Sequence, residues 1–115
     1  MIPANTPLEL YRNDSWIASG AIYDEQDPPQ IIDIQNATIL AQIRRRPGGS
    51  VVYSITNGYG ITINTDNTWE IDCIVTVSRA GKYYWDFQVT QNLTGTVNTY
   101  YGGICTIYDD ISRLT

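Results

Sequence analysis

The chain has 115 residues, of which 43% are hydrophobic and 17% are charged, and its formal net charge is −5. This length suits one domain with one core, which we expect to span residues 1–115, and seven Lys and Arg residues are too few for a nucleic-acid surface. No stretch approaches the roughly 20 apolar residues that cross a bilayer, and residues 1–5 lack the features of a signal peptide, so neither a membrane partner nor export is expected.

Short β-strands are predicted along the whole chain. In chain order their ranges are 8–12, 16–23, 37–45, 50–56, 60–64, 68–77, 82–91 and 97–108. The two clearest show the two-residue period of a strand with one buried and one wetted face. Their predicted buried faces are Trp69, Ile71, Cys73, Val75 and Val77 in the first, and Tyr83, Trp85, Phe87 and Val89 in the second.

Turn signals separate these strands. Residues 27–29 (DPP) end the N-terminal region, and residues 47–49 (PGG) join two strands at hairpin spacing. Asn57-Gly58 marks a further turn, because glycine supplies the positive φ that such turns need. About seven to eight short strands with turns about every 8–12 residues predict an all-β fold, an antiparallel β-sandwich.

Several blocks of the sequence, taken in order, resemble one family. Residues 8–16 (LELYRNDSW) match a block with Leu, a Tyr-Arg pair, Gly-Asp and an aromatic residue, although Asn13 replaces the glycine. Residues 33–39 and 42–49 match a second block that ends in a Gln-x-Arg strand and a Pro-Gly turn. Residues 81–89 (GKYYWDFQV) and 111–113 (ISR) complete the set. Together they resemble small immunoglobulin-like domains of tailed bacteriophages and prophages, which are associated with tail fibres and baseplates.

The resemblance implies an immunoglobulin-like sandwich and a non-enzymatic structural protein of the virion, assembled in the host cytoplasm. It implies docking to other virion proteins in the tail, the baseplate or at a fibre attachment, in many copies set by virion symmetry or as a homo-oligomer. A head decoration or head-fibre protein would share the fold, and sequence does not separate the two locations.

Four charged residues stand within otherwise apolar or aromatic strands. Asp14 and Asp86 are the carboxylates, and Arg12 and Arg44 are the nearest candidates for their partners. A half-buried Arg–carboxylate pair fixes strand register at modest net stability. We therefore expect these four residues to form structural ion pairs, with a binding role as the alternative.

The residues that carry most catalytic chemistry are missing. The chain has no histidine, which removes His-dependent triads and most zinc sites. Its one lysine, Lys82, adjoins a turn, and neither Cys73 nor Cys105 has a basic neighbour to lower its thiol pKa. Oxygen-rich loops at 24–27 and 64–67 lack the ligand spacing of a calcium loop. We expect no enzyme, metal or cofactor, and two unbridged cysteines, with a bridge as the alternative.

The aromatic residues divide into two predicted groups. Trp16, Trp69, Trp85 and Tyr83 are expected in the core. Outward rings are expected at Tyr59, Tyr84, Tyr100 and Tyr101, where they form a contact surface for proteins. The alternative function is a carbohydrate-binding module, in which such rings, Tyr100 and Tyr101 above all, recognise host glycans.

Overall fold

The computed structural model describes residues 4–109, and nine β-strands make up its regular structure. Their bounds are β1 (Ala4–Asn5), β2 (Leu8–Tyr11), β3 (Ser15–Ala21), β4 (Ala37–Arg44), β5 (Val51–Asn57), β6 (Gly60–Ile63), β7 (Thr68–Ile74), β8 (Gly81–Gln91) and β9 (Thr96–Tyr108). Within that range no helix is long and apolar enough to cross a membrane. The predicted all-β class is confirmed, with one or two strands more than expected.

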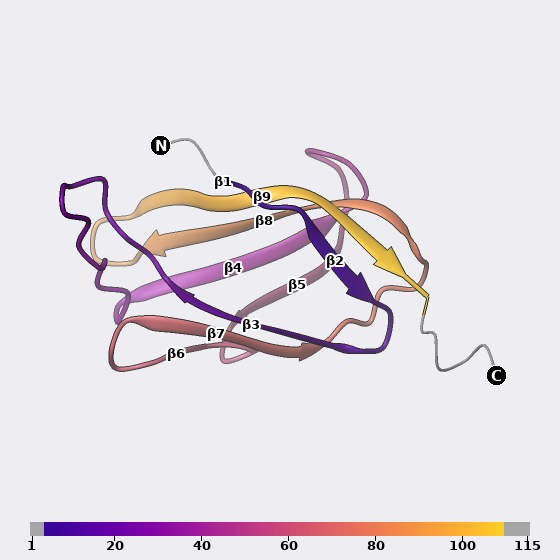
Figure 1. Cartoon of the computed structure of the whole chain (residues 1–115), viewed down its shortest axis with the longest axis horizontal. Coiled ribbons are helices and arrows are strands. Elements are labelled where there is room, and N and C mark those ends of the chain that lie inside the picture. Colours follow the sequence, from indigo (N-terminus) through magenta and orange to yellow (C-terminus); the bar gives the residue numbers. More distant parts are fainter. Residues whose placement is uncertain (1–3, 110–115) are drawn as a thin grey trace.

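All nine strands belong to one mixed sheet that curls into a half-barrel (Figure 1). The strand order is β1-β9-β8-β4-β5-β6-β7-β3, and β2 also pairs with β9. We call β1, β2, β9, β8, β4 and β5 the upper wall, and β6, β7 and β3 the lower wall. The ladder joins the two walls only where β5 meets β6, through the pairs Thr56↔Gly60 and Asn57↔Ile61.

The expectation of a purely antiparallel arrangement is wrong. β1 and β2 run parallel to β9, and β5 runs parallel to β6 over its short contact. The first exception arises because the chain leaves β2 for the lower wall and returns to the upper wall before β9, so that it enters both strands from the same end. The second arises at Gly58 and Gly60, with φ of 85° and 94°, where the chain turns a corner into the other wall instead of reversing.

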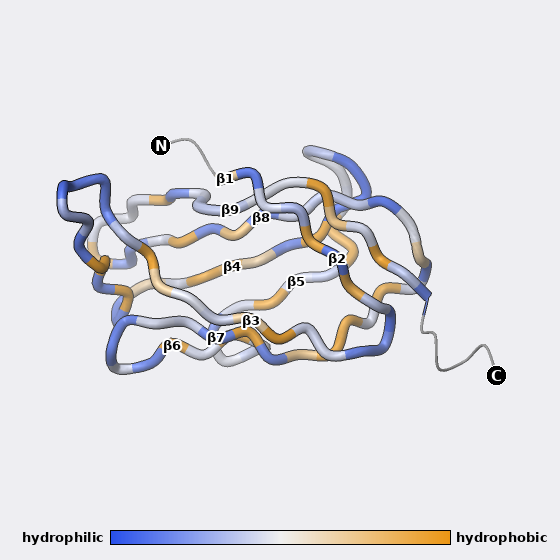
Figure 2. Tube along the Cα trace, in the orientation of Figure 1, coloured by the Kyte–Doolittle hydropathy of each residue, from blue (hydrophilic) through white to orange (hydrophobic). Residues whose placement is uncertain are grey.

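The core lies between the walls and follows the predicted alternation. Along β8, Tyr83, Trp85, Phe87 and Val89 are buried while the residues between them are partly exposed. Buried and more exposed positions also alternate along β4, and the loops at both ends of the molecule are largely hydrophilic (Figure 2). The sequence-predicted core residues Trp16 and Trp69 are buried as well.

Side-chain contacts fix the walls to each other and to their loops. Trp16 of β3 meets Trp85 of β8 edge to face, with ring centroids 6.0 Å apart. The Tyr53 hydroxyl of β5 donates to the Ile74 carbonyl at the end of β7, at 2.7 Å. The Tyr83 hydroxyl donates to the Arg79 carbonyl at 2.8 Å, which ties the start of β8 to the connection before it.

The two cysteines are free thiols, as expected. Cys105 of β9 is fully buried, and burial raises the pKa of its thiol to about 12. Cys73 of β7 is half-buried, and burial raises the pKa of its thiol too. Both residues therefore act in packing, as small apolar side chains do.

The bond from Tyr83 to Arg79 predicts a measurable loss of stability. Tyr83→Phe keeps the buried ring but leaves the Arg79 carbonyl without its partner, so we expect the free energy of unfolding to fall by about 1 kcal/mol. Urea denaturation should show an earlier midpoint with an unchanged slope. Tyr59→Phe is the matched control, because Tyr59 is 81% exposed. Equal midpoints for the two variants would contradict this role of Tyr83.

Candidate functional site

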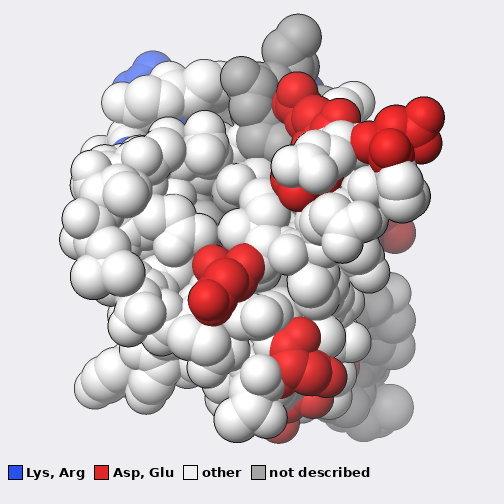
Figure 3. Space-filling model, turned by 90° about the vertical axis from the view of Figure 1, so that its left-hand side faces the viewer, with Lys and Arg blue, Asp and Glu red and all other residues white. Residues whose placement is uncertain are grey.

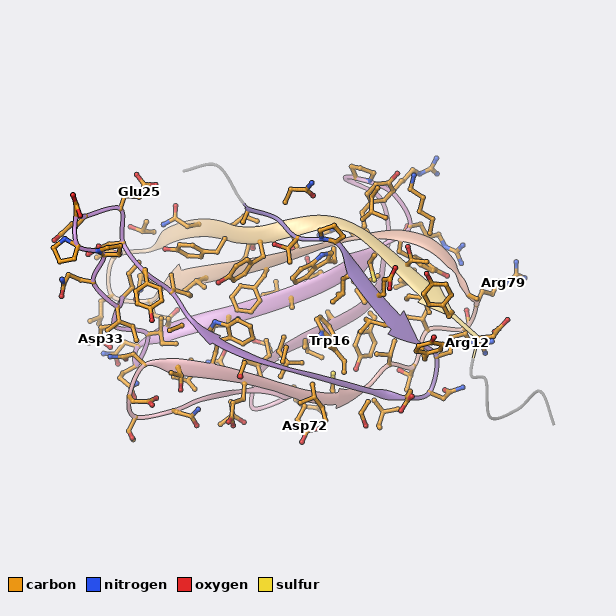
Figure 4. The ribbon with its side chains drawn as sticks, viewed as in Figure 1. Arg12, Trp16, Glu25, Asp33, Asp72 and Arg79 are labelled. Atoms are coloured by element: carbon orange, nitrogen blue, oxygen red, sulfur yellow. The ribbon has the colours of Figure 1, made fainter. Side chains whose placement is uncertain are left out.

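An apolar groove of about 250 Å³ opens between β3 and the β1–β2 segment. Its principal lining residues are Leu8, Trp16, Gly20, Trp69, Trp85 and Tyr101, and we call it the aromatic groove. Trp16 points from β3 into the interior (Figure 4). The rings that seal the core at this side of the half-barrel therefore also form the base of an open surface.

Two local features give the groove its shape. The Trp85 indole Nε1 donates to the Thr6 carbonyl at 2.7 Å, which fixes the segment between β1 and β2 along one rim. On the other rim Gly20 lies against the Trp69 indole, where a Cβ atom would approach the indole Cζ2 to 2.9 Å. Any side chain at Gly20 would thus displace the Trp69 ring.

The indole N–H of Trp69 is an unsatisfied hydrogen-bond donor. Its indole Nε1 is buried and, among the described residues, finds no acceptor. The ring itself is packed, with its centroid 4.8 Å from that of Phe87 and 6.2 Å from that of Tyr101. A buried donor without an acceptor costs roughly 1–3 kcal/mol. The unsatisfied donor lies at the base of the aromatic groove.

One long edge of β3 borders the groove and has no strand partner among residues 4–109. β3 ends the sheet order and pairs only with β7. The Asn64 N–H donates to the Thr68 carbonyl, so the alternation of an antiparallel ladder turns the even-numbered residues of β7 toward β6 and the odd-numbered ones toward β3. It follows that Ser15, Ile17 and Ser19 direct their backbone N–H and C=O groups to the free edge.

The outer face beside this edge carries two exposed isoleucines, Ile17 and Ile74, and two acidic residues. Ile17 is 73% exposed, and Glu70 and Asp72 of β7 are exposed next to it, with Asp72 pointing away from the interior (Figure 4). These residues share a shallow depression with Ser19. A partner that lies along β3 would therefore meet negative charge on its outer side.

Acidic groups gather at one end of the long axis, while at the other end Arg12 is paired with Asp109. Glu25 and Asp33 lie at one end, and Arg12 and Arg79 lie at the other (Figure 4). The first end shows several carboxylate groups, with basic groups only at its upper margin (Figure 3). Such a charge distribution orients a molecule during its encounter with a charged partner.

Arg12 forms an ion pair, but with Asp109 and not with either of the expected carboxylates, Asp14 and Asp86. The Arg12 Nη1 lies 2.7 Å from the Asp109 Oδ1, and its Nε donates to the Val77 carbonyl at 3.1 Å. Asp14 accepts from the backbone N–H of Ser15 instead. The turn at Asn13, with φ of 60°, carries the chain from one wall to the other, so neighbours in sequence face different partners.

Arg44, Tyr84 and Asp86 converge, but not as the expected ion pair. Arg44 donates from Nη1 to the Gly49 carbonyl and from Nη2 to the Gln42 Oε1, and the part of the chain that the structure describes holds no salt bridge from it to Asp86. All three residues line a hollow of about 330 Å³ on the outer face of the upper wall. We call it the polar hollow; its other lining residues are Pro47, Gly48, Trp85 and Gly103.

The four tyrosines predicted as outward rings behave differently from one another. Tyr59 is the most exposed, in the corner between β5 and β6, and Tyr84 is half-buried beside the polar hollow. Tyr100 packs partly against the core. The outward orientation expected for Tyr101 is wrong, because its ring meets Phe87 with centroids 5.3 Å apart. A β-bulge beside this pair shifts the register of β9 by one residue. A strict two-residue alternation of side chains does not allow for such a shift.

The carboxylates of the predicted oxygen-rich loops accept hydrogen bonds from residues near them in sequence. Asp24 accepts from the backbone N–H groups of Gln26 and Gln30, and Asp66 accepts from the backbone and the hydroxyl of Thr68. These Thr68 hydrogen bonds lower the pKa of the Asp66 carboxyl. Over residues 4–109 no group of three or more acidic, Cys or His residues is placed to hold a metal ion.

Sequence reasoning missed the aromatic groove. It placed Trp69 in the core, which is correct, but gave its indole no special role. The available signal was Gly20, since a glycine inside a strand often marks close approach of another group. Comparison with models of known protein families finds no match for this chain, and comparison with curated proteins finds none either.

The pKa of Asp86 predicts how its replacement changes stability. Burial raises the pKa of this carboxyl, and the charge of Arg44 opposes the effect only in part. The carboxylate therefore destabilises the folded state at neutral pH, and this cost disappears as the pH falls through the folded-state pKa. We expect Asp86→Asn to raise Tm at pH 7 and the difference to vanish below about pH 4.

Thermal denaturation across this pH range measures the effect, with Asp72→Asn as the exposed control. A Tm for Asp86→Asn below that of the parent protein at pH 7 would show instead that the carboxylate stabilises the fold.

Proposed function

We propose that this chain is a non-enzymatic structural protein of a tailed-phage virion that works by docking to other virion proteins. The observation that carries the proposal is the aromatic groove beside the free edge of β3. An apolar groove offers burial to a partner's side chains, and an open strand edge offers hydrogen bonds to its backbone. The family resemblance of residues 8–16 and 81–89 supports the phage setting.

We infer further that the fold is a variant of the immunoglobulin sandwich. The order β9-β8-β4-β5 opposite β3-β7-β6 agrees with the two sheets of variable-type immunoglobulin domains. The hydrogen bond from Tyr83 to the Arg79 carbonyl has the form of a tyrosine corner, a feature that immunoglobulin domains carry near the start of a strand, here β8. Trp16 and Trp85 contact each other where that family places its disulfide between sheets, so an aromatic contact would replace the covalent one.

The proposed mechanism is addition of an extended strand along β3. Side chains of such a strand alternate, so every second one would enter the aromatic groove while its backbone paired with Ser15, Ile17 and Ser19. Glu70 and Asp72 favour a strand with basic residues on its outer side. A second copy of the chain, with a net charge of −5, would be repelled, so we propose another virion protein as the partner.

Many copies set by virion symmetry would make weak single contacts sufficient. Tail, baseplate and head locations all remain compatible with this mode of docking. The alternative of glycan recognition by Tyr100 and Tyr101 is less favoured, because the Tyr101 ring is committed to Phe87 and Trp69.

The first test asks whether the chain is part of the particle. Mass spectrometry of purified virions from the phage that encodes it should detect the chain at a fixed copy number per particle. Virions that contain none of it would overturn the proposal.

The second test asks whether β3 is the docking edge. Ser19→Pro removes a backbone N–H from the free edge and leaves the β7 ladder intact, and edge strands tolerate proline. We expect at least a tenfold loss of co-sedimentation of the variant with particles produced without the chain, while Ser19→Thr, which keeps the N–H, binds normally. Equal binding of the two variants, both with the parent circular dichroism spectrum, would exclude β3 as the edge.

A further inference from the structure

A second surface, the polar hollow, brings an arginine, a carboxylate and a tyrosine ring together. It lies on the outer face of the upper wall, away from the aromatic groove, at the ladder positions where Gln42 opposes Asp86 and Arg44 opposes Tyr84. Its volume of about 330 Å³ is at the lower end of the range for small-molecule sites. The hollow is therefore large enough for one sugar-sized ring.

The Asp86 carboxylate in this hollow lacks a partner. It is half-buried, and no side-chain or backbone donor among the described residues makes a hydrogen bond to it. Its oxygens are open to solvent, so a ligand can reach them, but the partial burial still disfavours the charged form. Burial raises its pKa accordingly. A ligand with hydroxyl donors would offset this cost.

Arg44 is held in place by the protein itself. Its Nη1 donates to the Gly49 carbonyl at 2.8 Å and its Nη2 to the Gln42 Oε1 at 2.7 Å. A guanidinium has five N–H donors, so these two bonds orient it and leave others for a ligand. The hollow thus offers a fixed set of donors beside the free acceptor of Asp86.

The remaining walls of the hollow are apolar or bare. Tyr84 and Pro47 supply a ring each, and Gly48 and Gly103 add no side chain. Across the sheet from Asp86 stands Gly102, where a Cβ would come within 3.1 Å of the Trp85 carbonyl. The absence of side chains on this stretch of β9 keeps the space beside Asp86 open.

The charges of the hollow decide which ligand fits. An anion would gain from Arg44 and be repelled by Asp86, and a cation would experience the reverse. A neutral ligand with adjacent hydroxyl groups can donate to Asp86 and accept from Arg44 at once, while its apolar face lies against a ring. We propose that the polar hollow binds a neutral hexose unit of a glycan, independently of docking at β3.

The test uses the isolated parent chain and a panel of methyl glycosides of glucose, galactose, mannose and N-acetylglucosamine, titrated to about 10 mM and followed by NMR. We expect saturable shifts of the backbone amides of Tyr84, Asp86 and Gly103 with at least one glycoside. Asp86→Ala should weaken this binding at least about tenfold.

Glu25→Ala is the matched control, since it removes an exposed carboxylate that does not line the hollow and should leave the affinity unchanged. Loss of binding in both variants, saturable shifts only at other residues, or no binding to any glycoside would overturn the proposal. Because no particle or partner protein is present, this outcome does not depend on whether docking at β3 occurs.

Discussion

The packing of Trp16 and Trp69 against aromatic rings of β8 and β9 is the interaction on which the two walls of the half-barrel depend. The ladder links the walls only where β5 meets β6, and Tyr53 adds a single hydrogen bond to β7. A hydrogen bond contributes about 1 kcal/mol, whereas truncation of a buried tryptophan costs about 3–5 kcal/mol. Aromatic burial therefore dominates the cohesion of the walls. It also sets the separation between β3 and the β1–β2 segment.

The aromatic groove follows from this arrangement. Large rings hold the walls apart at one side, and Gly20 offers no side chain to cover them. An open edge beside an apolar surface is a risk for aggregation, which proteins commonly limit with charge. Glu70, Asp72 and the overall charge of −5 oppose pairing between copies. The same charges permit a basic partner strand, so protection against self-pairing and selectivity for a partner have one cause.

Local pattern predicted the strands and the core well. The alternation in residues 68–77 and 82–91 placed Trp69, Tyr83 and Phe87 correctly in the core, because side-chain direction in a strand depends only on the two-residue period. Parallel pairing of β1 and β2 with β9 was not predictable in this way, since it joins residues 97 positions apart in sequence, such as Ala4 and Tyr101.

The site was only partly predictable for the same reason. Arg44, Tyr84 and Asp86 were singled out as unusual residues and do converge, because adjacent antiparallel strands bring them together. The partner of Arg12 depends on the turn at Asn13. The inward ring of Tyr101 depends on the β-bulge that shifts the register of β9 by one residue. The free edge of β3 depends on its place at the end of the sheet order, which is a property of the whole fold.

Electron cryomicroscopy of the intact phage particle tests the docking of β3 most directly. A reconstruction should show an extended segment of another virion protein paired along β3, with an apolar side chain seated against Trp69 and Tyr101. A reconstruction in which the chain is present, its contacts lie elsewhere and β3 faces solvent would contradict the account.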